Sequence, residues 1–361
     1  MKEKISGFIL IFLAIFLLFL AGQYFYFYSG FYFKPSLPKI SFEGISLPQT
    51  ETKIFSEVFE RRKGLILVDF AHDNDFQPEE ISLLTFRITS RGFNFQYLKE
   101  KSDLEAKLRS ADALVVILPR EEFTEKENNL IKEFKEKGGK ILLIADPTRN
   151  SKINSLSTDL GIIFESDYLY NQKENDGNFR YIFIKDFKSD SDLTKNLEKV
   201  VLYSASSISS PDWGLAFSDE NTFSSTNETK TKFSPIVFSE DAKVLAISDL
   251  TFLQEPYNLN YDNNQFIANL ADWLTRSERI FHLSDFPYFF EGEVEINYAR
   301  ADYLDLGLKL KNFLKNLEKN SRLSQYEKTP AQDSIFLGLF DDGGKVREIL
   351  KEGQITLGGA K

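Results

Sequence analysis

The amino-acid sequence predicts an α/β protein, in which a doubly wound, mainly parallel sheet follows one N-terminal transmembrane helix and precedes a small C-terminal α+β domain. Three observations predict this class. Short apolar runs alternate with helical patterns between residues 64 and 147, as in consecutive βαβ units. The same alternation returns between residues 243 and 275. Near the start of the chain, the stretch from Ile5 to Gly22 contains no charged residue.

Composition limits the classes of function. The chain has 361 residues, with 44 Lys and Arg against 54 Asp and Glu, and a net charge of −10. Nucleic acids and anionic membrane surfaces bind clustered positive charge, so we expect no nucleic-acid partner. The chain has no cysteine, which excludes disulfides, thiolate metal sites and a cysteine nucleophile.

The first 33 residues are predicted to form a membrane anchor. At 1.5 Å per residue, the 18 residues from Ile5 to Gly22 reach roughly 27 Å, close to the hydrocarbon thickness of a bilayer. Aromatic residues follow and resemble the belt that lies at a headgroup layer: Tyr24, Tyr26, Tyr28 and Tyr32. A cleaved signal peptide is the alternative, but Leu20-Ala21-Gly22 is a poor cleavage site. We therefore expect contact with the lipid bilayer through residues 5–33.

Charges near the anchor predict its orientation. Lys2 and Lys4 favour a cytoplasmic N-terminus and an extracytoplasmic body, although Lys34 and Lys39 weaken that asymmetry. Residues 34–62 contain three prolines and are expected to form an extended stalk or linker.

The first elements of the body are expected between residues 64 and 108. Gly64 to Phe70 is a continuous apolar strand, and Phe93 to Leu98 is a second strand. Between them, Pro78 starts a helix that Gly92 ends. After the second strand, Ser102 and Glu105 have the spacing of a capping box for a short helix.

The clearest unit runs from Asp112 to Pro147, DALVVILPREEFTEKENNLIKEFKEKGGKILLIADP. It predicts a buried strand, a helix that begins with a Thr124–Glu127 capping box, and a second buried strand. Gly138 and Gly139 end the helix, because glycine adopts the left-handed conformation without a Cβ clash.

The pattern is less regular between residues 148 and 242. We expect strands at Phe179 to Ile184 and Val200 to Ser204, as antiparallel additions to the core sheet with long connections. Regularity returns with a strand at Lys243 to Asp249 and a helix at Asn263 to Thr275, so the main domain is predicted to span residues 63–276.

The C-terminal part, residues 277–361, is predicted to be a small separate α+β domain. Its expected order is strand, helix, two strands, helix and strand, which is the ferredoxin-like arrangement. A leucine stripe from Leu306 to Leu317 marks its first helix, and Lys345 to Glu352 its second.

On these residues, the region 63–276 resembles the glutamine-amidotransferase-like domain of membrane-anchored prokaryotic proteins of unknown function, including auxiliary subunits of gliding-type ABC transporters. The resemblance implies a flavodoxin-like sheet. It also implies that the turn after the strand Ala113 to Leu118 corresponds to the one that carries a cysteine nucleophile in the relatives. Here that turn reads Pro119-Arg120-Glu121-Glu122, so amidotransfer by a thiolate is excluded.

The candidate ligand-binding residues lie where predicted parallel strands end. Asp69, Asp146 and Asp249 each end a strand, and ligands of open α/β sheets bind outside these carboxyl ends. We therefore expect these aspartates to converge on one rim that binds a cation, a sugar or a polar peptide group. Amide and imidazole groups complete the candidate set: His72, Asn74, Asn263 and Asn264.

A structural role for the same residues is the alternative. Asp69, Asp73 and Asp75 also suit caps of the following helix, and His72 also suits a local turn. Asp249 and Asn263 also suit the cap of the last helix. The serine cluster from Ser204 to Ser210 is interpreted as a turn before Pro211. We assign no catalytic residue, no metal and no cofactor.

From the anchor, the resemblance and the missing cysteine, the expected function is a non-enzymatic, single-pass membrane scaffold with an inactive amidotransferase-like domain. Such a scaffold implies protein partners in a cell-surface or ABC-transporter-associated complex. Two alternatives stay open. One is a hydrolase or metal-dependent enzyme acting at the Asp69, His72 and Asp249 rim. The other is recognition of a glycan or peptide at that rim without catalysis.

Overall fold

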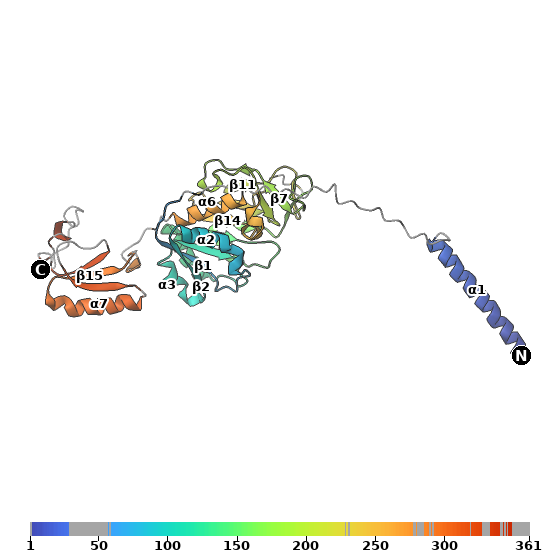
Figure 1. The fold of residues 1–361 in the computed structure, drawn as a ribbon, viewed down its shortest axis with the longest axis horizontal. Helices are drawn as coiled ribbons and strands as arrows, with labels where there is room; N and C mark the ends of the chain where they lie inside the picture. Colours follow the sequence, from blue (N-terminus) through green and yellow to red (C-terminus); the bar gives the residue numbers. More distant parts are fainter. Residues whose placement is uncertain are drawn as a thin grey trace. The chain divides into compact units, whose positions relative to one another are not determined.

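The computed structural model of the protein describes residues 2–28, 57, 59–227, 229, 232–276, 279, 285–288, 290, 292–317, 319–326, 333–339, 342, 344 and 346–348 (Figure 1). The chain divides into two units, Met1–Gln49 and Thr50–Lys361, and each is described by itself.

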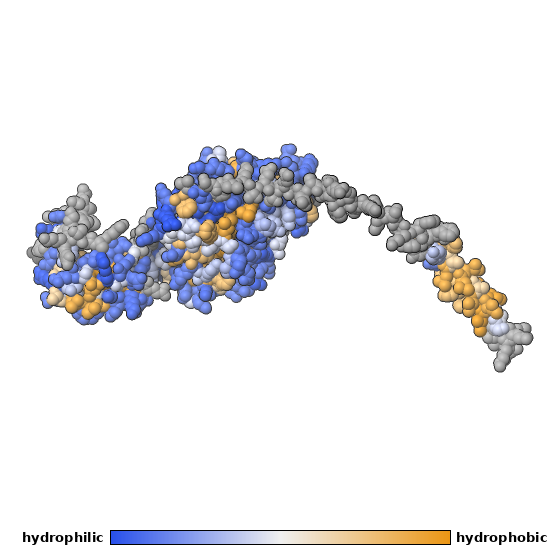
Figure 2. Space-filling view, viewed as in Figure 1, coloured by the Kyte–Doolittle hydropathy of each residue, from blue (hydrophilic) through white to orange (hydrophobic). Residues whose placement is uncertain are grey.

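The first unit contains one long helix, α1 (Lys2–Tyr28). Its segment Ser6–Phe27 has a mean hydropathy of 2.5, and none of it is buried inside the protein. Figure 2 shows this helix as a nearly uniform hydrophobic surface. The segment has the length and composition of a membrane span, a property that helical signal sequences share.

Among the described residues of the second unit, eight strands form the largest sheet, in the order β2-β1-β3-β4-β14-β13-β11-β8. Five of them are parallel: β2 (Phe93–Leu98), β1 (Gly64–Asp69), β3 (Ala113–Ile117), β4 (Lys140–Ile144) and β14 (Val244–Ile247). Three antiparallel strands extend it: β13 (Ile236–Phe238), β11 (Gly214–Phe217) and β8 (Asp186–Phe187). The predicted α/β fold with a large, mainly parallel sheet is confirmed.

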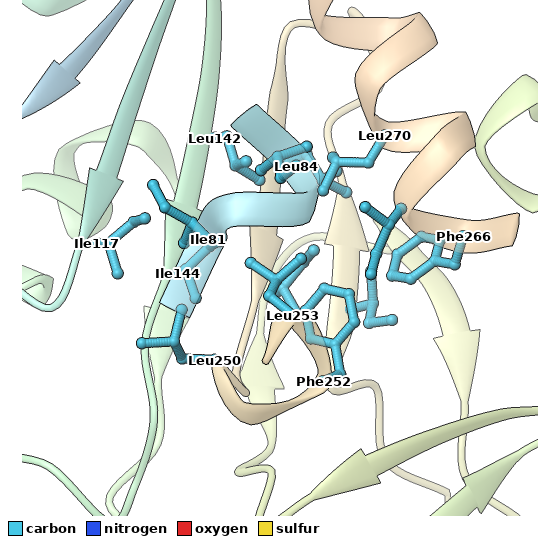
Figure 3. Packing of buried hydrophobic residues seen from close by; sticks show 14 of the residues in the cluster. Ile81, Leu84, Ile117, Leu142, Ile144, Leu250, Phe252, Leu253, Phe266 and Leu270 are labelled. Carbon is cyan, nitrogen blue, oxygen red and sulfur yellow. The ribbon is translucent and has the colours of Figure 1, made fainter. Parts of the chain in front are cut away.

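Helices cover both faces of the parallel strands. On one face, α2 (Ser82–Ser90) and α6 (Asn263–Thr275) contribute to the first core cluster, part of which Figure 3 shows. On the other face, α3 (Leu104–Leu108) and α4 (Glu125–Glu136) contribute to the second cluster. Successive strand residues alternate between the clusters, because strand side chains have a period of two. Both faces are therefore dry, which explains why β3 and β4 read as continuous apolar runs.

The start of α4 follows the predicted capping box. The Thr124 hydroxyl accepts a hydrogen bond from the backbone N–H of Glu127, and the Glu127 carboxylate accepts one from the backbone N–H of Thr124. At the other end, Gly138 has a φ of +87°. The box predicted at Ser102 and Glu105 is wrong: Ser102 lies in a 3₁₀ turn, and among the described residues its hydroxyl donates to Asp103 rather than capping the helix.

Residues 148–242 form small satellite sheets as well as the three antiparallel strands. The predicted strands appear as β7 (Tyr181–Ile184) and β9 (Val200–Tyr203), but they pair with each other rather than with the core sheet. The remaining pairs are β5 (Ile163–Phe164) with β10 (Ile208–Ser209), and β6 (Leu169–Asn171) with β12 (Thr222–Ser224). The short helix α5 (Asn154–Ser157) lies in the same region.

Towards the C-terminus, β15 (Val294–Tyr298), α7 (Leu304–Asn316), β16 (Ser321–Gln325) and β17 (Ser334–Leu337) follow in order. β15 pairs in parallel with both β16 and β17. The strands joined by α7 are thus direct neighbours, so the split βαβ of the expected ferredoxin-like arrangement is wrong. Only Val346–Glu348 of the expected second helix is described as helical, and the last strand lies outside the described residues. The domain boundaries stay predictions.

Replacing Thr124 with Ala should lower the free energy of unfolding by about 1 kcal/mol, because the first turn of α4 loses its side-chain cap. The measurement is urea denaturation of the detergent-solubilised chain followed by circular dichroism. Thr89→Ala is the matched control: the exposed Thr89 hydroxyl bonds only carbonyls of its own helix, and its loss should stay within about 0.5 kcal/mol. Equal losses from both variants would contradict the capping role.

Candidate functional site

The order of the parallel strands defines where a site is expected. The chain runs from β1 outward to β2 and then returns past β1 to β3, so the winding reverses between β1 and β3. In a doubly wound sheet of this order, the crevice outside the carboxyl ends of these two strands is the usual ligand site. Asp69 ends β1, and Ile117 ends β3.

Three of the predicted site residues meet at this point. His72 Nδ1 lies 2.9 Å and 3.1 Å from the two carboxylate oxygens of Asp69. The Asn74 amide donates to Asp69 Oδ2 at 3.1 Å and to the Ile117 carbonyl at 2.8 Å, while its oxygen accepts from the His72 backbone N–H at 3.1 Å. All three side chains are buried. The loop after β1 is therefore tied to the end of β3 by its own side chains.

Two residues from the segment after β3 close the other side of the imidazole. The Phe123 ring stacks on His72 with centroids 3.7 Å apart, and Glu127 Oε1 lies 3.5 Å from His72 Nε2. Within the described part of the chain, Nε2 has no hydrogen-bond partner. Burial acts to raise the pKa of Glu127, but hydrogen bonds from Thr124 and the nearby His72 hold that pKa below its usual value.

These contacts leave no room for a ligand at the imidazole, since His72 is 0 % exposed. Leu118, which follows β3, has a φ of +45°, the sharp left-handed bend that positions a nucleophile at strand-to-helix elbows. A buried leucine occupies the bend here, and its side chain offers no nucleophilic atom. The fold thus keeps the shape of an elbow without its chemistry.

Asp146 and Asp249 form a second, separate group. Asp146 Oδ1 accepts from the Thr148 backbone at 2.9 Å and from its hydroxyl at 2.5 Å. Asp249 accepts from the backbone N–H groups of Tyr203 at 2.6 Å and Thr251 at 2.9 Å. Burial, followed by the charge of Asp146, raises the pKa of Asp249 well above its usual value. The predicted rim is therefore divided by its hydrogen bonds into an Asp69 group and an Asp249 group.

The two asparagines hold α6 in place. Asn263 exchanges hydrogen bonds of 3.0 Å with the backbone N–H and C=O of Val201, and it also donates to the Tyr257 carbonyl. The Asn264 oxygen accepts from Arg87 of α2. The hydrogen bonds of both side chains therefore join α6 to neighbouring parts of the protein. Ligand binding by the seven candidate residues stays a prediction.

Sequence reasoning missed one feature. A cavity of about 600 Å3 lies beyond the end of β4 and is lined by Asp146, Tyr168, Arg180 and Ser204, among others. Ser204 belongs to the serine cluster interpreted above as a turn. Its φ of +74° was not readable from the sequence, because nothing in the serine run distinguishes this position.

Comparison with known proteins gives one family. Residues 65–212 match the family of the IFT52 GIFT domain. The solved "mmIFT52 N-terminal domain" is 18% identical, with a TM-score of 0.50 over 60% of this chain and 100% of that one. A ThuA-like protein from Bacteroides uniformis is 14% identical, with a TM-score of 0.39 over 62% of this chain and 96% of that one. No curated protein shows a significant match.

These matches correct two expectations. The resemblance to auxiliary subunits of ABC transporters is wrong, because the family found is that of the IFT52 GIFT domain. The expected function was a scaffold in an ABC-transporter-associated or cell-surface complex, with an enzyme or a glycan binder at the Asp69, His72 and Asp249 rim as the alternative. That expectation is wrong for the same reason. The structural likeness supports the fold, and the family match covers residues 65–212, which is less than half of the chain.

The raised pKa of Asp249 predicts a pH dependence of stability. A carboxyl with a higher pKa in the folded state binds more protons when folded, so its contribution is complete below the unfolded pKa of about 3.9 and is lost as pH rises through the folded pKa. The free energy of unfolding of the native chain minus that of the Asp249→Asn variant should therefore fall as pH rises from about 4. The total fall should be about 1.4 kcal/mol for each pH unit that separates the folded and unfolded pKa values of Asp249. Urea titrations at several pH values measure this difference. A difference that grows with pH would refute the assignment.

Proposed function

We propose that this chain is a protein-binding component of a multi-protein assembly, and that its GIFT-like domain binds an extended segment of a partner. The similarity to the IFT52 GIFT domain supports the class of function, since IFT52 is a component of a multi-protein intraflagellar transport complex. The closed crevice at His72 and the leucine at the elbow fit a domain that binds rather than catalyses.

The observation that carries this proposal is that, among the described residues, no strand pairs with the outer edge of the large sheet at β2. β2 is the last strand on its side, and its sequence FNFQYL contains no charge and no proline. The Leu98 carbonyl accepts from the Phe70 N–H, so the backbone of Leu98 faces β1. Because backbone groups alternate along a parallel strand, those of Phe93, Phe95 and Tyr97 face the free edge. An uncharged edge of this length is a template for another strand.

Aromatic rings accompany the edge. Phe95 and Tyr97 lie edge to face with centroids 5.3 Å apart, and Tyr97 and Phe70 lie 5.5 Å apart. Phe70 is 36 % exposed, and Phe95 and Tyr97 are half-buried. A docked strand gains main-chain hydrogen bonds from the edge and apolar contact from these rings.

Charges near the edge favour acidic side chains in the docked segment. Phe93 to Gln96 line a groove together with the basic residues Arg62, Lys63 and Lys107. Asp103 and Asp112 also line the groove, but basic side chains outnumber them there, and the Asp112 carboxylate already accepts from the Leu65 N–H at 2.8 Å. The proposed ligand is therefore an extended, acidic segment of a partner protein.

Two substitutions test the edge. Phe95→Pro removes an N–H that faces away from β1, so it blocks a docking strand without breaking the ladder to β1. Lys63→Glu reverses a charge beside the groove at an exposed position. In cross-linked complexes purified from cells with the full chain, both variants should retain about tenfold less of the partner that cross-links to β2 in the native chain.

Lys126→Glu, at an exposed position of α4, is the matched control and should retain the native amount. The proposal fails if the partner is retained by both edge variants, if cross-links fall elsewhere on the domain, or if the chain purifies alone. Turnover of a substrate that depends on His72 would also overturn it.

For location, we propose that α1 spans a bilayer, with its N-terminus in the cytoplasm and the body on the other side. The apolar, 22-residue segment Ser6–Phe27, about 33 Å long as a helix, and the lysines before it support this orientation.

Leu13→Lys with Leu17→Lys should release the chain from membranes during alkaline extraction, whereas Lys2→Ala should leave it bound. Protease added outside intact cells should cleave the body, and a body protected from it would reverse the orientation.

A further inference from the structure

The cavity beyond the end of β4 is distinct from the β2 edge and from the His72 cluster, and it offers a binding site of its own. Its volume of about 600 Å3 is within the range of small-molecule sites. Most of its lining is polar: hydroxyl, amide and charged side chains come from the segments 145–154, 164–168 and 204–206, with Arg180 beside them.

Most charged groups of the lining already have partners. Asp146 accepts from Thr148, as described above. Asp167 accepts from the Ser207 backbone at 2.8 Å and its hydroxyl at 2.9 Å, and Glu165 accepts from the Ser209 hydroxyl at 2.5 Å. Arg149 donates to the Asp75 carbonyl at 2.8 Å and pairs with Glu80.

Arg180 differs from these groups. Its guanidinium lies over the Tyr168 ring, 4.0 Å from the centroid, and within the described residues it forms no ion pair with a carboxylate. Stacking on an aromatic face orients the guanidinium and leaves its N–H edge available. Arg180 is half-buried, so a bound anion would be partly shielded from water and salt.

Ser204 lies next to Arg180. The Ser204 backbone N–H donates to the Arg180 carbonyl at 3.1 Å, which holds the two residues side by side. The φ of +74° at Ser204 is unusual for a residue with a Cβ, and such strain is common where a side chain must be aimed at a ligand. In the described structure, the Ser204 hydroxyl has no hydrogen-bond partner in the protein.

We propose that this cavity binds a small hydroxylated monocarboxylate, of the size and chemistry of a sugar acid. The carboxylate pairs with the Arg180 guanidinium and accepts from the Ser204 hydroxyl. Its hydroxyl groups donate to the carboxylates of Asp146, Glu165 and Asp167, which retain acceptor capacity. Those same carboxylates repel a dianion about twice as strongly as a monoanion, so a phosphate monoester should bind less well than a monocarboxylate. This binding activity goes beyond the proposed assembly function.

Saturation-transfer NMR and calorimetry on the full chain in detergent micelles test it, with D-glucuronate as the probe. Glucuronate should bind saturably, D-glucose should bind at least about tenfold more weakly because it lacks the anion, and acetate should also bind weakly because it lacks the hydroxyl groups. Glucose 6-phosphate should compete only weakly with glucuronate.

Three variants locate the binding. Arg180→Gln should weaken glucuronate about tenfold and leave glucose unchanged, and Arg180→Lys should restore part of the affinity. Ser204→Gly suits the left-handed backbone and removes only the hydroxyl, so it should weaken glucuronate a few-fold with an unchanged melting temperature. Lys173→Gln, at an exposed position outside the cavity lining, is the control and should bind as the native chain does.

The inference is wrong if glucuronate fails to saturate the native chain, if glucose binds equally well, or if Arg180→Gln binds as tightly as the native chain. It is separable from the assembly function, because the cavity variants should retain the cross-linked partner in full. Loss of the partner with glucuronate binding intact would count against the assembly function alone.

Discussion

The structure depends on one constraint: the parallel strands at the centre of the large sheet are covered on both faces. Ile117, Leu142 and Ile144 point into one core cluster, while Leu114 and Val116 point into the other. Because their side chains have no contact with water, a polar side chain in the middle of these strands would be buried at a cost in free energy. Polar side chains are therefore confined to the strand ends. The carboxyl ends of β1, β4 and β14 therefore carry the aspartates, and every site considered above lies beyond those ends or on an outer edge.

The same constraint explains what the sequence predicts well. Strands buried on both faces appear as uninterrupted apolar runs, so β1, β3, β4 and β14 were found close to their true bounds, as was the α4 capping box, whose partners are three residues apart. Prediction was poorer where partners are distant in sequence. β6 pairs with β12 about 50 residues later, and no local pattern encodes such a pairing. The capping box predicted at Ser102 and Glu105 is wrong because the chain makes a 3₁₀ turn there. The sequence separation between Ser102 and Glu105 cannot reveal that turn.

The site was predicted only in part. The strand ends gave the positions of Asp69, Asp146 and Asp249, but not the direction of their side chains. Asp69 bonds inward to His72, and Asp249 accepts from the backbone of Tyr203, which is 46 residues away. The cavity of Arg180 and Ser204 was missed because its walls come from several segments, and because a positive φ at serine leaves no trace in the sequence. The family match further shows that a resemblance based on strand order can lead to the wrong relatives.

The two edge strands of the large sheet differ in length, and this difference limits how many further strands the sheet can bind. β2 has six residues along an open edge, whereas β8 at the opposite end has only two, Asp186 and Phe187. A two-residue strand offers too few main-chain groups to hold a docked strand, and Asp186 places a charge on this edge. Growth of the sheet can therefore occur on one side only. The strand docking proposed at β2 would therefore make a closed one-to-one pair through the sheet, which could not propagate into a filament.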